Sequence, residues 1–544
     1  MATLRARGVS LSFDAAPVLV DVDLLVAPGQ RIGVVGPNGT GKSTLLRVLA
    51  GQLVPDDGVV EAAPPSATVG LLPQEPDRRL DETVADFIAR RTGVADATAE
   101  LEAATQGLAD AAPGADDRYA AALDRWLALG GPDLDARIGA TLADLGLDGA
   151  LATQATATLS GGQAARVSLA ATVLARFDVF LLDEPTNDLD FAGLDRLERF
   201  LVDLDAATVV VSHDRAFLER VVTHVLDLDE HTHTARLYGG GWNAYLADRA
   251  TARRHAEEAF DTYQAKRGEL TERARTQREW SVQGVKKSKK SGETDKFIRF
   301  KNTADSEKVA HKAKATERAM DRLEKVDKPW EGWELRFEIG TAERSGDVVA
   351  SLHGAVVERG DFRLGPVDLQ VGWADRVAIL GENGAGKTTL IDLVLGRIEP
   401  TSGSVHLGPG VVVGELSQRR DRFATERTLL DVVLDATGMR LDETRSLLAK
   451  FGLTADHVAR PAERLSPGER TRANLALFMA EGVNCLVLDE PTNHLDLVAI
   501  EQLEQALDRY VGTLLLVTHD RRFLDRVSVT RRLEVAGGRV RELG

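Results

Sequence analysis

A glycine-rich motif occurs twice in this chain, and the duplication constrains the fold more than any other feature of the sequence. The copies, GPNGTGKS at 36–43 and GENGAGKT at 381–388, both follow the pattern G-x-x-x-x-G-K-[ST]. Three further motifs recur in the same order: LSGGQ and LSPGE, LLDEPTN and VLDEPTN, VSHD and VTHD. Because a repeated order of motifs indicates repeated domains, we predict two domains of one architecture.

Each glycine motif lies between an expected strand and an expected helix. RIGVVG and RVAILG are short apolar runs of the kind found in buried parallel strands. STLLRVLAG and TTLIDLVLG have helical apolar spacing and end at glycine. This order predicts the α/β class, with domains at 1–242 and 329–544 and a segment of different composition at 243–328.

The glycine motifs have the chemistry of a phosphate-binding loop. Glycines let consecutive backbone N–H groups turn towards a phosphate, and the positive end of the following helix adds to the attraction. Lys42 and Lys387 are expected to reach the β- and γ-phosphates, and Ser43 and Thr388 are expected to hold Mg²⁺. The predicted ATP-binding residues of the loops are Gly36, Pro37, Asn38, Gly39, Thr40, Gly41, Lys42, Ser43 and Thr44, and Gly381, Glu382, Asn383, Gly384, Ala385, Gly386, Lys387, Thr388 and Thr389.

The runs VFLLDE and CLVLDE each end in two carboxylates. Asp183 and Asp489 are placed to bind Mg²⁺. Glu184 and Glu490 are placed to orient and polarise an attacking water. An isolated Asp-Glu pair is usually a solvated turn, but a pair that follows a phosphate loop at a repeated spacing favours catalysis.

Two histidines follow these glutamates at one common distance. His213 lies 29 residues after Glu184, and His519 lies 29 residues after Glu490. A single histidine at the end of a strand is usually a capping residue. The repeated offset instead predicts that both are catalytic residues that sense the γ-phosphate.

The sequence LSGGQ, between the phosphate loop and the Asp-Glu strand, resembles the signature of ABC ATPases. The resemblance implies a head-to-tail sandwich, in which each ATP contacts the phosphate loop of one half and the signature helix of the other. The N-terminus of that helix would then face the γ-phosphate. The signature residues implied to bind ATP are Ser160, Gly161, Gly162 and Gln163, opposite Lys387, and Ser466, Gly468 and Glu469, opposite Lys42.

Further ATP-site residues are implied by the same resemblance. Gln74 and Gln418 look like residues that contact Mg²⁺ and water. Phe13 looks like the aromatic residue that stacks on adenine. At the equivalent offset the second half has Glu358, which cannot stack on adenine in this way. Phe362, four residues later, is the alternative stacking residue of the second half.

The two sites differ in composition. In the second signature, Pro467 removes a backbone donor and Glu469 adds a negative charge. Asp188 in the first DEPTN segment corresponds to His494 in the second. Since both sites keep the lysine, aspartate, glutamate and histidine, we expect both to hydrolyse ATP at unequal rates.

The middle segment is basic in an otherwise acidic chain. Residues 251–328 hold 21 Lys and Arg against 14 Asp and Glu, whereas the whole chain carries −17. Apolar spacing predicts helices at about 245–280 and 304–326 that form a hairpin, with a basic tip at about 281–303. A lysine cluster is usually only solvated, but at the end of a hairpin it indicates contact with RNA. The candidate RNA contacts are Lys286, Lys287, Lys289, Lys290, Lys296, Arg299 and Lys301.

DEPTNHLD and YGGGWNAYL, together with the long middle segment, resemble the ABC-F class. The resemblance implies two tandem ABC-type P-loop ATPase domains joined by a long α-helical hairpin linker. It implies a cytoplasmic monomer that uses ATP and Mg²⁺ and binds the ribosome in its ATP-closed state. The linker would act near the P-site transfer RNA and the peptidyl transferase centre, either to protect the ribosome from antibiotics or to control translation.

Two other functions stay open. One is the ATPase subunit of an ABC transporter whose membrane part is a separate chain, since no run of about 18 apolar residues occurs here. The other is a DNA-acting ABC ATPase, which would usually carry a long coiled coil or a zinc site. The single cysteine, Cys485, argues against zinc and suits a reducing cytoplasm.

The first half also contains 38 residues more than the second between its glutamine and its signature. This insertion, at about 94–131, reads as two alanine-rich helices around a Pro-Gly turn. It resembles the arm of some ABC-F proteins, although an ornamental surface hairpin is the alternative.

Overall fold

A computed structural model describes residues 2–543 except 15, 74–80, 188, 291–314, 317, 319–343, 361, 417–420 and 494. For residues 161, 277–278, 280–290, 421 and 467 it describes the backbone alone. The chain divides into two compact units, one comprising Met1–Asn243 with Trp333–Gly544 and the other Ala244–Gly332. The first unit therefore contains both repeats, and the second contains the segment between them.

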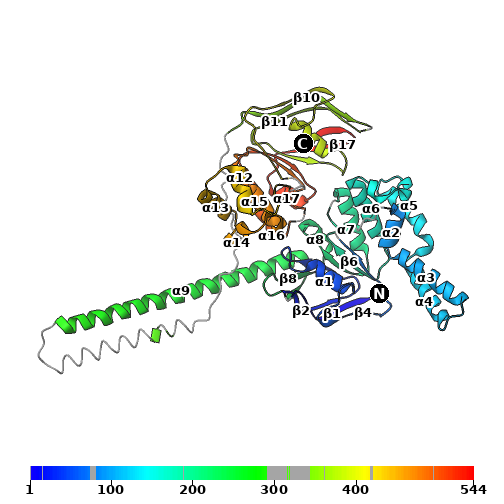
Figure 1. The fold of residues 1–544 in the computed structure, drawn as a ribbon, viewed down its shortest axis with the longest axis horizontal. Coiled ribbons are helices and arrows are strands. Elements are labelled where there is room, and N and C mark those ends of the chain that lie inside the picture. The colour runs from blue at the N-terminus through cyan, green and yellow to red at the C-terminus, as the bar shows by residue number, and fades with distance from the viewer. Residues whose placement is uncertain are drawn as a thin grey trace. The chain divides into compact units, whose positions relative to one another are not determined.

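Each repeat has a six-stranded central sheet and a three-stranded antiparallel sheet (Figure 1). The first central sheet has the order β5 (Val69–Leu72), β6 (Val179–Asp183), β7 (Ala207–Val211), β3 (Arg31–Val35), β8 (His224–Leu228) and β9 (Ala235–Gly239). The second has the order β14 (Val413–Leu416), β15 (Cys485–Asp489), β16 (Thr513–Val517), β12 (Arg376–Leu380), β17 (Arg531–Ala536) and β18 (Arg539–Leu543). In each sheet the first five strands pair in parallel and the last pairs antiparallel. The identical order confirms the predicted α/β class and the duplication.

The antiparallel sheets cover one face of the central sheets. Their orders are β2 (Ala16–Val26), β1 (Thr3–Phe13), β4 (Asp57–Ala63) and β11 (Phe362–Gly372), β10 (Val348–Arg359), β13 (Ser402–Leu407). The first core cluster contains Leu4 of β1, Val34 of β3 and Leu45 of α1 (Lys42–Leu49), all fully buried. Helix α1 is thus held between the two sheets of its repeat, and α11 (Lys387–Val394) is held in the same way.

Helices cover the remaining faces of each repeat. In the first repeat they are α2 (Val84–Arg91), α3 (Val94–Ala109), α4 (Ala115–Ala128), α5 (Leu134–Asp144), α6 (Gly161–Leu174), α7 (Phe191–Asp203) and α8 (Arg215–Val221), with 3₁₀ turns η1 (Gly131–Asp133), η2 (Gly149–Thr153) and η3 (Thr156–Thr158). In the second they are α12 (Leu429–Thr437), α13 (Leu441–Lys450), α14 (Ala455–Ala459), α15 (Pro467–Ala480), α16 (Leu497–Arg509) and α17 (Arg521–Arg526), with η4 (Asp421–Phe423) and η5 (Ala462–Arg464).

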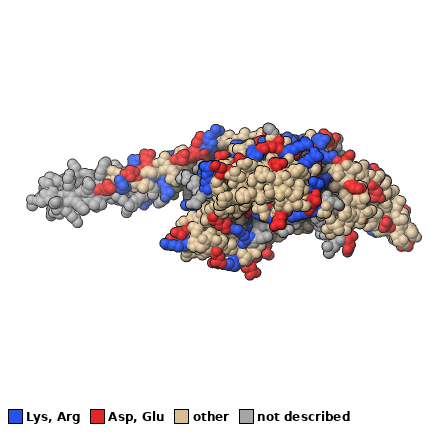
Figure 2. Space-filling view, turned by 90° about the horizontal axis from the view of Figure 1, so that it is seen from above, with Lys and Arg blue, Asp and Glu red and all other residues tan. Residues whose placement is uncertain are grey.

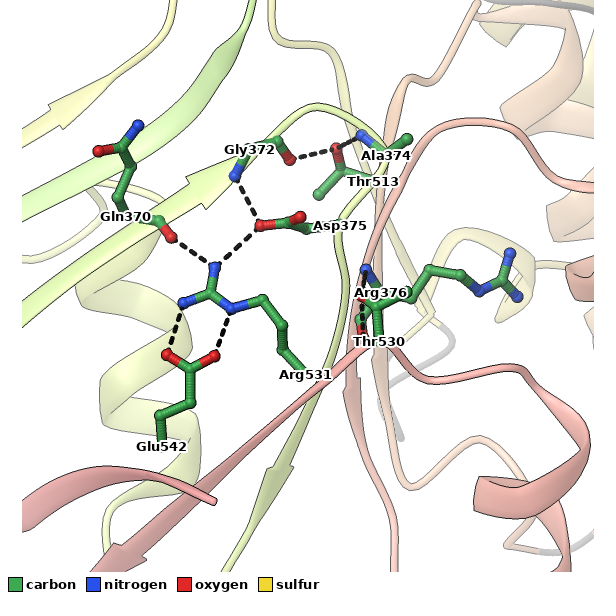
Figure 3. A network of polar contacts seen from close by, with 9 residues as sticks. All are labelled: Gln370, Gly372, Ala374, Asp375, Arg376, Thr513, Thr530, Arg531 and Glu542. Atoms are coloured by element: carbon green, nitrogen blue, oxygen red, sulfur yellow. Dashed lines mark hydrogen bonds and ion pairs between the residues drawn. The ribbon is translucent and has the colours of Figure 1, made fainter. Parts of the chain in front are cut away.

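A polar network ties the antiparallel sheet of the second repeat to its central sheet (Figure 3). The guanidinium of Arg531 donates to both carboxylate oxygens of Glu542, at 2.6 and 2.9 Å, and to Oδ2 of Asp375 at 2.9 Å. It also donates to the carbonyl of Gln370, near the end of β11. The hydroxyl of Thr513 accepts from the Ala374 backbone at 3.0 Å. These bonds fix the turn that leads into β12, the strand before the second phosphate loop.

The inserted arm consists of α3 and α4, which lie antiparallel beside the helical layer of the first repeat (Figure 1). Gly114, with φ +74°, begins α4 after Pro113. The indole N–H of Trp126 donates to the Thr98 hydroxyl at 3.0 Å, and Arg125 pairs with Glu100 at 3.2 Å. These polar contacts join the two helices at the end where α3 begins and α4 ends.

The second unit begins within α9 (Gly241–Lys290), a single helix of 50 residues. The prediction that this helix ends near 280 is wrong. The sequence SVQGVKKSKK has no proline and one glycine, so nothing in it breaks a helix. Figure 2 shows basic and acidic side chains mixed along the described part of α9, where Arg253 pairs with Glu257 and Arg275 with Glu272. The second predicted helix, at about 304–326, lies almost wholly outside the described residues, of which 315, 316 and 318 are helical.

Candidate functional site

The two phosphate loops are folded around their lysines. Nζ of Lys42 donates to the carbonyls of Gly36 and Pro37, both at 2.8 Å. Nζ of Lys387 donates to the carbonyl of Gly381 at 2.7 Å and to that of Glu382 at 3.1 Å. Burial lowers the pKa of both lysines, and carboxylates nearby oppose the shift. The loops therefore present a partly desolvated cation at the N-terminus of a helix, which suits a phosphate.

Glycine is required just before each lysine. Gly41 and Gly386 have φ of +93° and +105°, which L-residues rarely adopt. A Cβ at Gly41 would lie 2.7 Å from Cγ1 of Val18, and a Cβ at Gly386 would lie 2.6 Å from Cζ of Phe362. Because glycine has no side chain, the loop backbone can pack against Val18 or Phe362 and adopt the conformation that surrounds a phosphate.

The residues predicted to bind Mg²⁺ meet at each loop. The Thr388 hydroxyl donates to Oδ2 of Asp489 at 3.4 Å. Burial raises the pKa of both aspartates, and the Ser43 side chain lies close enough to Asp183 to lower the pKa of that carboxyl against this effect. Oδ1 of Asp183 is buried and has no hydrogen-bond partner among the described residues. Mg²⁺ prefers oxygen ligands, and it would offset the negative charge of the buried aspartates. The hydroxyl and carboxylate oxygens at each loop therefore fit a Mg²⁺ ion. Gln74 and Gln418 lie outside the described residues.

Each catalytic glutamate candidate adopts a strained backbone at the end of its strand. Glu184 and Glu490 have φ of +48° and +47°. In each, Oε2 accepts a 3.3 Å hydrogen bond from the backbone of its histidine, His213 or His519. Left-handed conformations of such residues are costly and cluster at functional sites. Burial raises the pKa of Glu184 to about 8, despite the opposing effect of Lys42.

The two histidines are arranged differently. Nε2 of His213 lies 3.2 Å from Oε1 of Glu184. Nε2 of His519 lies 3.1 Å from Nζ of Lys387 and 3.5 Å from Oε1 of Glu490. Burial, and then the charge of Lys387, lower the pKa of His519 to about 4. The second histidine is therefore neutral at pH 7 and sits next to the phosphate-loop lysine.

Both signatures form capping boxes at helix N-termini. Oγ of Ser160 accepts from the Gln163 backbone at 3.3 Å, and Oε1 of Gln163 accepts from the Ser160 backbone at 2.9 Å. Ser466 and Glu469 exchange the same pair of bonds at 3.2 and 2.8 Å. Pro467 occupies the first helical position, where the missing N–H breaks no bond within the helix.

The extra charge of Glu469 is balanced within the second half. Its Oε1 lies 2.9 Å from Nε2 of His457 and 3.5 Å from Nη2 of Arg460. The Glu469 carboxylate is thus engaged on both sides, because its other oxygen caps the helix. The negative charge that distinguishes this signature is offset by the Arg460 guanidinium, while His457, whose pKa is lowered by burial, contributes a polar contact.

Contacts between the halves bring the phosphate loops and signatures together. The backbone N–H of Asn38 donates to Oδ2 of Asp496 at 3.1 Å, and that of Asn383 donates to Oδ2 of Asp190 at 3.2 Å. A Cβ at Gly162 would lie 2.7 Å from Cβ of Asn383. A cavity of about 710 Å³ lies between the halves, lined by Gly162, Glu184, Lys387, Thr388, Glu490 and His519. The second phosphate loop and the first signature therefore share one cavity.

Reciprocal ion pairs flank these contacts. Arg215 of α8 pairs with Glu504 of α16, and both side chains are buried. Arg521 of α17 pairs with Glu198 of α7 at 3.1 Å. None of these residues, and neither Asp190 nor Asp496, was predicted as a site residue. A repeat signal was available for the two aspartates, which end DLD and HLD, and for the two arginines, which belong to HDR in both repeats. The two glutamates lie outside these motifs.

The two predicted adenine-stacking residues have different surroundings. Phe13 ends β1 and is 49% exposed. Phe362 begins β11, lies against Gly386 and lines the cavity. Phe362, the alternative stacking residue of the second half, therefore lies at the second site.

The predicted RNA-contact residues fall in two groups. Lys286, Lys287, Lys289 and Lys290 belong to the last turns of α9, for which the backbone is described. Lys296, Arg299 and Lys301 lie outside the described residues. No helix in the described part of the chain is long and apolar enough to cross a membrane.

The duplicated fold, the phosphate loops and the opposed signatures define the class of ABC proteins with two nucleotide-binding domains. The family model described as "ABC transporter" matches residues 19–187 and 364–493. The structure titled "RNase-L Inhibitor" has a TM-score of 0.57 at 19% identity and covers 99% of this chain and 89% of its own. This likeness supports the fold.

Curated relatives narrow the class to one family. The tylosin resistance ATP-binding protein TlrC of Streptomyces fradiae is 36% identical, over 96% of this chain and 95% of TlrC. The energy-dependent translational throttle protein EttA of Mycobacterium tuberculosis is 33% identical, over 94% of this chain and 87% of EttA. ABC transporter F family member 2 of Arabidopsis thaliana is 30% identical, over 98% of this chain and 76% of that protein. The chain belongs to the ABC-F family of ATP-binding proteins.

Proposed function

We propose that the protein hydrolyses ATP at two sites built from both halves. The observation that carries this proposal is the reciprocal pair of hydrogen bonds, Asn38 to Asp496 and Asn383 to Asp190. Each bond joins the phosphate loop of one half to the segment between the glutamate and the next helix in the other. Such an arrangement suits a nucleotide that is bound between two domains and holds them together.

The residues of each site have distinct roles in this proposal. Lys42 and Lys387 bind the β- and γ-phosphates, while the capped helices beginning after Ser160 and Ser466 face the γ-phosphate of the opposite site. Glu184 and Glu490 orient water and accept its proton, and the raised pKa of Glu184 suits a general base. Mg²⁺, held by Ser43 with Asp183 or by Thr388 with Asp489, would neutralise phosphate charge.

We further propose that the ATP-closed form binds the ribosome as a monomer in the cytoplasm, with the linker directed to the P-site transfer RNA and the peptidyl transferase centre. Support comes from the names of its relatives, of which one concerns tylosin resistance and another translation. The lysines at 286–290 place positive charge at the end of a 50-residue helix. Positive charge of this kind favours RNA phosphates.

Sedimentation with ribosomes tests this proposal. The variant Glu184→Gln with Glu490→Gln retains the phosphate loops and should trap ATP. We expect it to co-sediment with ribosomes when ATP is present and not when ATP is absent. Lys42→Ala with Lys387→Ala is the control, which should stay in the supernatant in both conditions. Equal recovery with and without ATP, or no recovery, would contradict ribosome binding by the ATP-closed form.

A second measurement distinguishes ribosome protection from translation control. Translation in a cell-free system is measured with and without tylosin and with increasing amounts of the protein. Rescue in the presence of tylosin indicates protection, whereas an effect without the drug indicates translation control. Deletion of 286–299 should spare ATP hydrolysis and remove either effect. Association with membranes together with absence from ribosomes would instead favour the ATPase subunit of a transporter.

A further inference from the structure

The first residue of α7 reaches the active site of the other half. Oδ1 of Asp190 caps α7 by accepting from the Gly193 backbone at 2.9 Å, while its Oδ2 accepts from Asn383 in the second phosphate loop. The next residue, Phe191, is consequently carried against the second half. Its ring centroid lies 5.1 Å from that of His519, and the two planes make an angle of 79°.

Phe191 is itself held from a second direction. The guanidinium carbon of Arg521 lies 5.6 Å from the centroid of its ring. The same guanidinium pairs with Asp195 at 2.7 Å and with Glu198 at 3.1 Å. Residues 191, 195 and 198 share one face of α7 because they are four and three positions apart. The start of α17 therefore contacts one face of α7 through an aromatic ring and two carboxylates.

The His519 ring depends on this contact. Its Nε2 faces Lys387 and Glu490, at 3.1 and 3.5 Å. Its Nδ1 is buried and has no hydrogen-bond partner among the described residues. Since rotation about χ2 of histidine has broad minima, polar contacts on one nitrogen leave the plane of the ring weakly defined. The edge-to-face contact with Phe191 defines it.

The residue at the corresponding position of the second half is not aromatic. Asp496 caps α16 by accepting from Ala499 at 2.8 Å and also accepts from Asn38, so it reproduces both bonds of Asp190. The following residue is Leu497. The two halves are thus alike in their hydrogen bonds and differ in the residue that follows the capping aspartate, Phe191 in one half and Leu497 in the other.

We propose that Phe191 is a positioning residue, supplied by the first half, that orients His519 at the second ATP site. The proposal rests on the proposed ATPase function, in which His519 senses the γ-phosphate. If the His519 ring is already oriented, its Nε2 would contact the γ-phosphate without a prior rotation of the ring. Since Leu497 stands at the corresponding position of the second half, the ordering contact of Phe191 distinguishes the second site, and we expect the two rates of hydrolysis to be unequal.

The test measures each site separately. In the Glu184→Gln protein, the second site alone keeps its catalytic glutamate. In the Glu490→Gln protein, the first site alone keeps it. In the Glu184→Gln protein, Phe191→Leu introduces the residue found at 497. We expect kcat to fall roughly 3- to 10-fold with KM for ATP nearly unchanged. Phe191→Tyr keeps the ring and should restore kcat to within about 2-fold.

The effect should be specific to the second site. In the Glu490→Gln protein, Phe191→Leu should lower kcat much less than in the Glu184→Gln protein. Equal losses in both backgrounds, or no rescue by tyrosine, would overturn the proposal in favour of a purely structural role. If neither single-site protein nor the wild type hydrolyses ATP, the proposed ATPase function fails instead.

A spectroscopic measurement gives a readout that needs no turnover. The chain has 11 histidines, and the ring signal of His519 is identified as the one lost in His519→Gln. The ring of Phe191 shifts this signal because it faces the imidazole. Phe191→Leu should displace the signal, whereas Phe191→Tyr should leave it near its original position. An unmoved signal in Phe191→Leu would refute the orientation of His519 by Phe191.

Discussion

The backbone N–H of Asn383 donates a 3.2 Å hydrogen bond to the carboxylate of Asp190, which lies 193 positions earlier in the chain. The same carboxylate caps α7. One side chain therefore links the phosphate loop of the second half to a helix of the first. Displacement of the loop would disturb the helix end, and displacement of the helix would disturb the loop.

The close approach of Gly162 to Asn383 predicts unequal effects of alanine at the two signatures. Gly162→Ala would place Cβ 2.7 Å from Cβ of Asn383 and 3.2 Å from its backbone carbon. Gly468→Ala would meet Ala499 of its own half at 3.2 Å. We expect Gly162→Ala to reduce hydrolysis at the second site roughly 10-fold, since overpacking costs about 1–3 kcal/mol. Gly468→Ala should cost the first site less. Single-site proteins provide the measurement, and equal losses would contradict the asymmetry.

The ion pairs between the halves should differ in strength. Arg215 and Glu504 are 8% and 11% exposed, whereas Arg522 and Glu219 are 31% and 42% exposed and 3.7 Å apart. Loss of one member of a buried pair leaves an uncompensated charge. We expect Arg215→Ala to lower the free energy of unfolding by about 3 kcal/mol and Arg522→Ala by less than about 1 kcal/mol. Urea denaturation measures both, and a similar loss in the two variants would argue against burial as the cause.

Two aspartates predict opposite pH effects on stability. Burial, and then the carboxylate of Asp520, raise the pKa of Asp214 to about 6. A raised pKa stabilises the native state below the ordinary pKa near 3.8, and this stabilisation is lost as pH rises through 6. Asparagine still caps a helix. Asp214→Asn should therefore gain stability relative to wild type between pH 4 and 7, by at most about 3 kcal/mol.

Asp229 is the control for that measurement. Hydrogen bonds, the largest contribution coming from the Thr232 backbone, lower its pKa. A lowered pKa stabilises the native state at neutral pH, and this stabilisation is lost on acidification. Asp229→Asn should therefore be less stable than wild type at pH 7 and approach it in acid. Thermal unfolding between pH 3 and 8 measures the stability of both variants. Parallel curves of stability against pH for wild type and Asp214→Asn would refute the prediction for Asp214.

The aromatic residues at the two sites predict separate effects on nucleotide affinity. Phe362 lines the cavity of the second site, and Phe13 is half exposed at the end of β1. Stacking on a base contributes about 1–3 kcal/mol. With a fluorescent ATP analogue, Phe362→Ala in Lys42→Ala protein should weaken binding by at least about 5-fold. Phe13→Ala in Lys387→Ala protein tests the first site. Unchanged affinity would exclude that residue as the adenine platform.

Much of the fold could be predicted because its signals are local. The apolar runs before Gly36 and Gly381 became β3 and β12, and the helices after them begin at Lys42 and Lys387. Strand, glycine loop and helix depend on neighbouring residues and on their apolar spacing. The end of α9 was misjudged because the charged residues after 280 suggested a loop, while their helix propensity allowed the helix to continue to Lys290.

The sequence by itself determined that two equivalent α/β domains exist, each with a phosphate loop, two acidic residues and a histidine, because these patterns are repeated. Only the tertiary structure decided which residues of opposite halves meet. Asp190 with Asn383, Arg215 with Glu504 and Phe191 with His519 are separated by 193 positions or more. Their contact depends on how two folded surfaces dock, and no local pattern carries that information. The asymmetry between Phe191 and Leu497 is visible in the sequence, but it gained a physical meaning once His519 was found beside the ring.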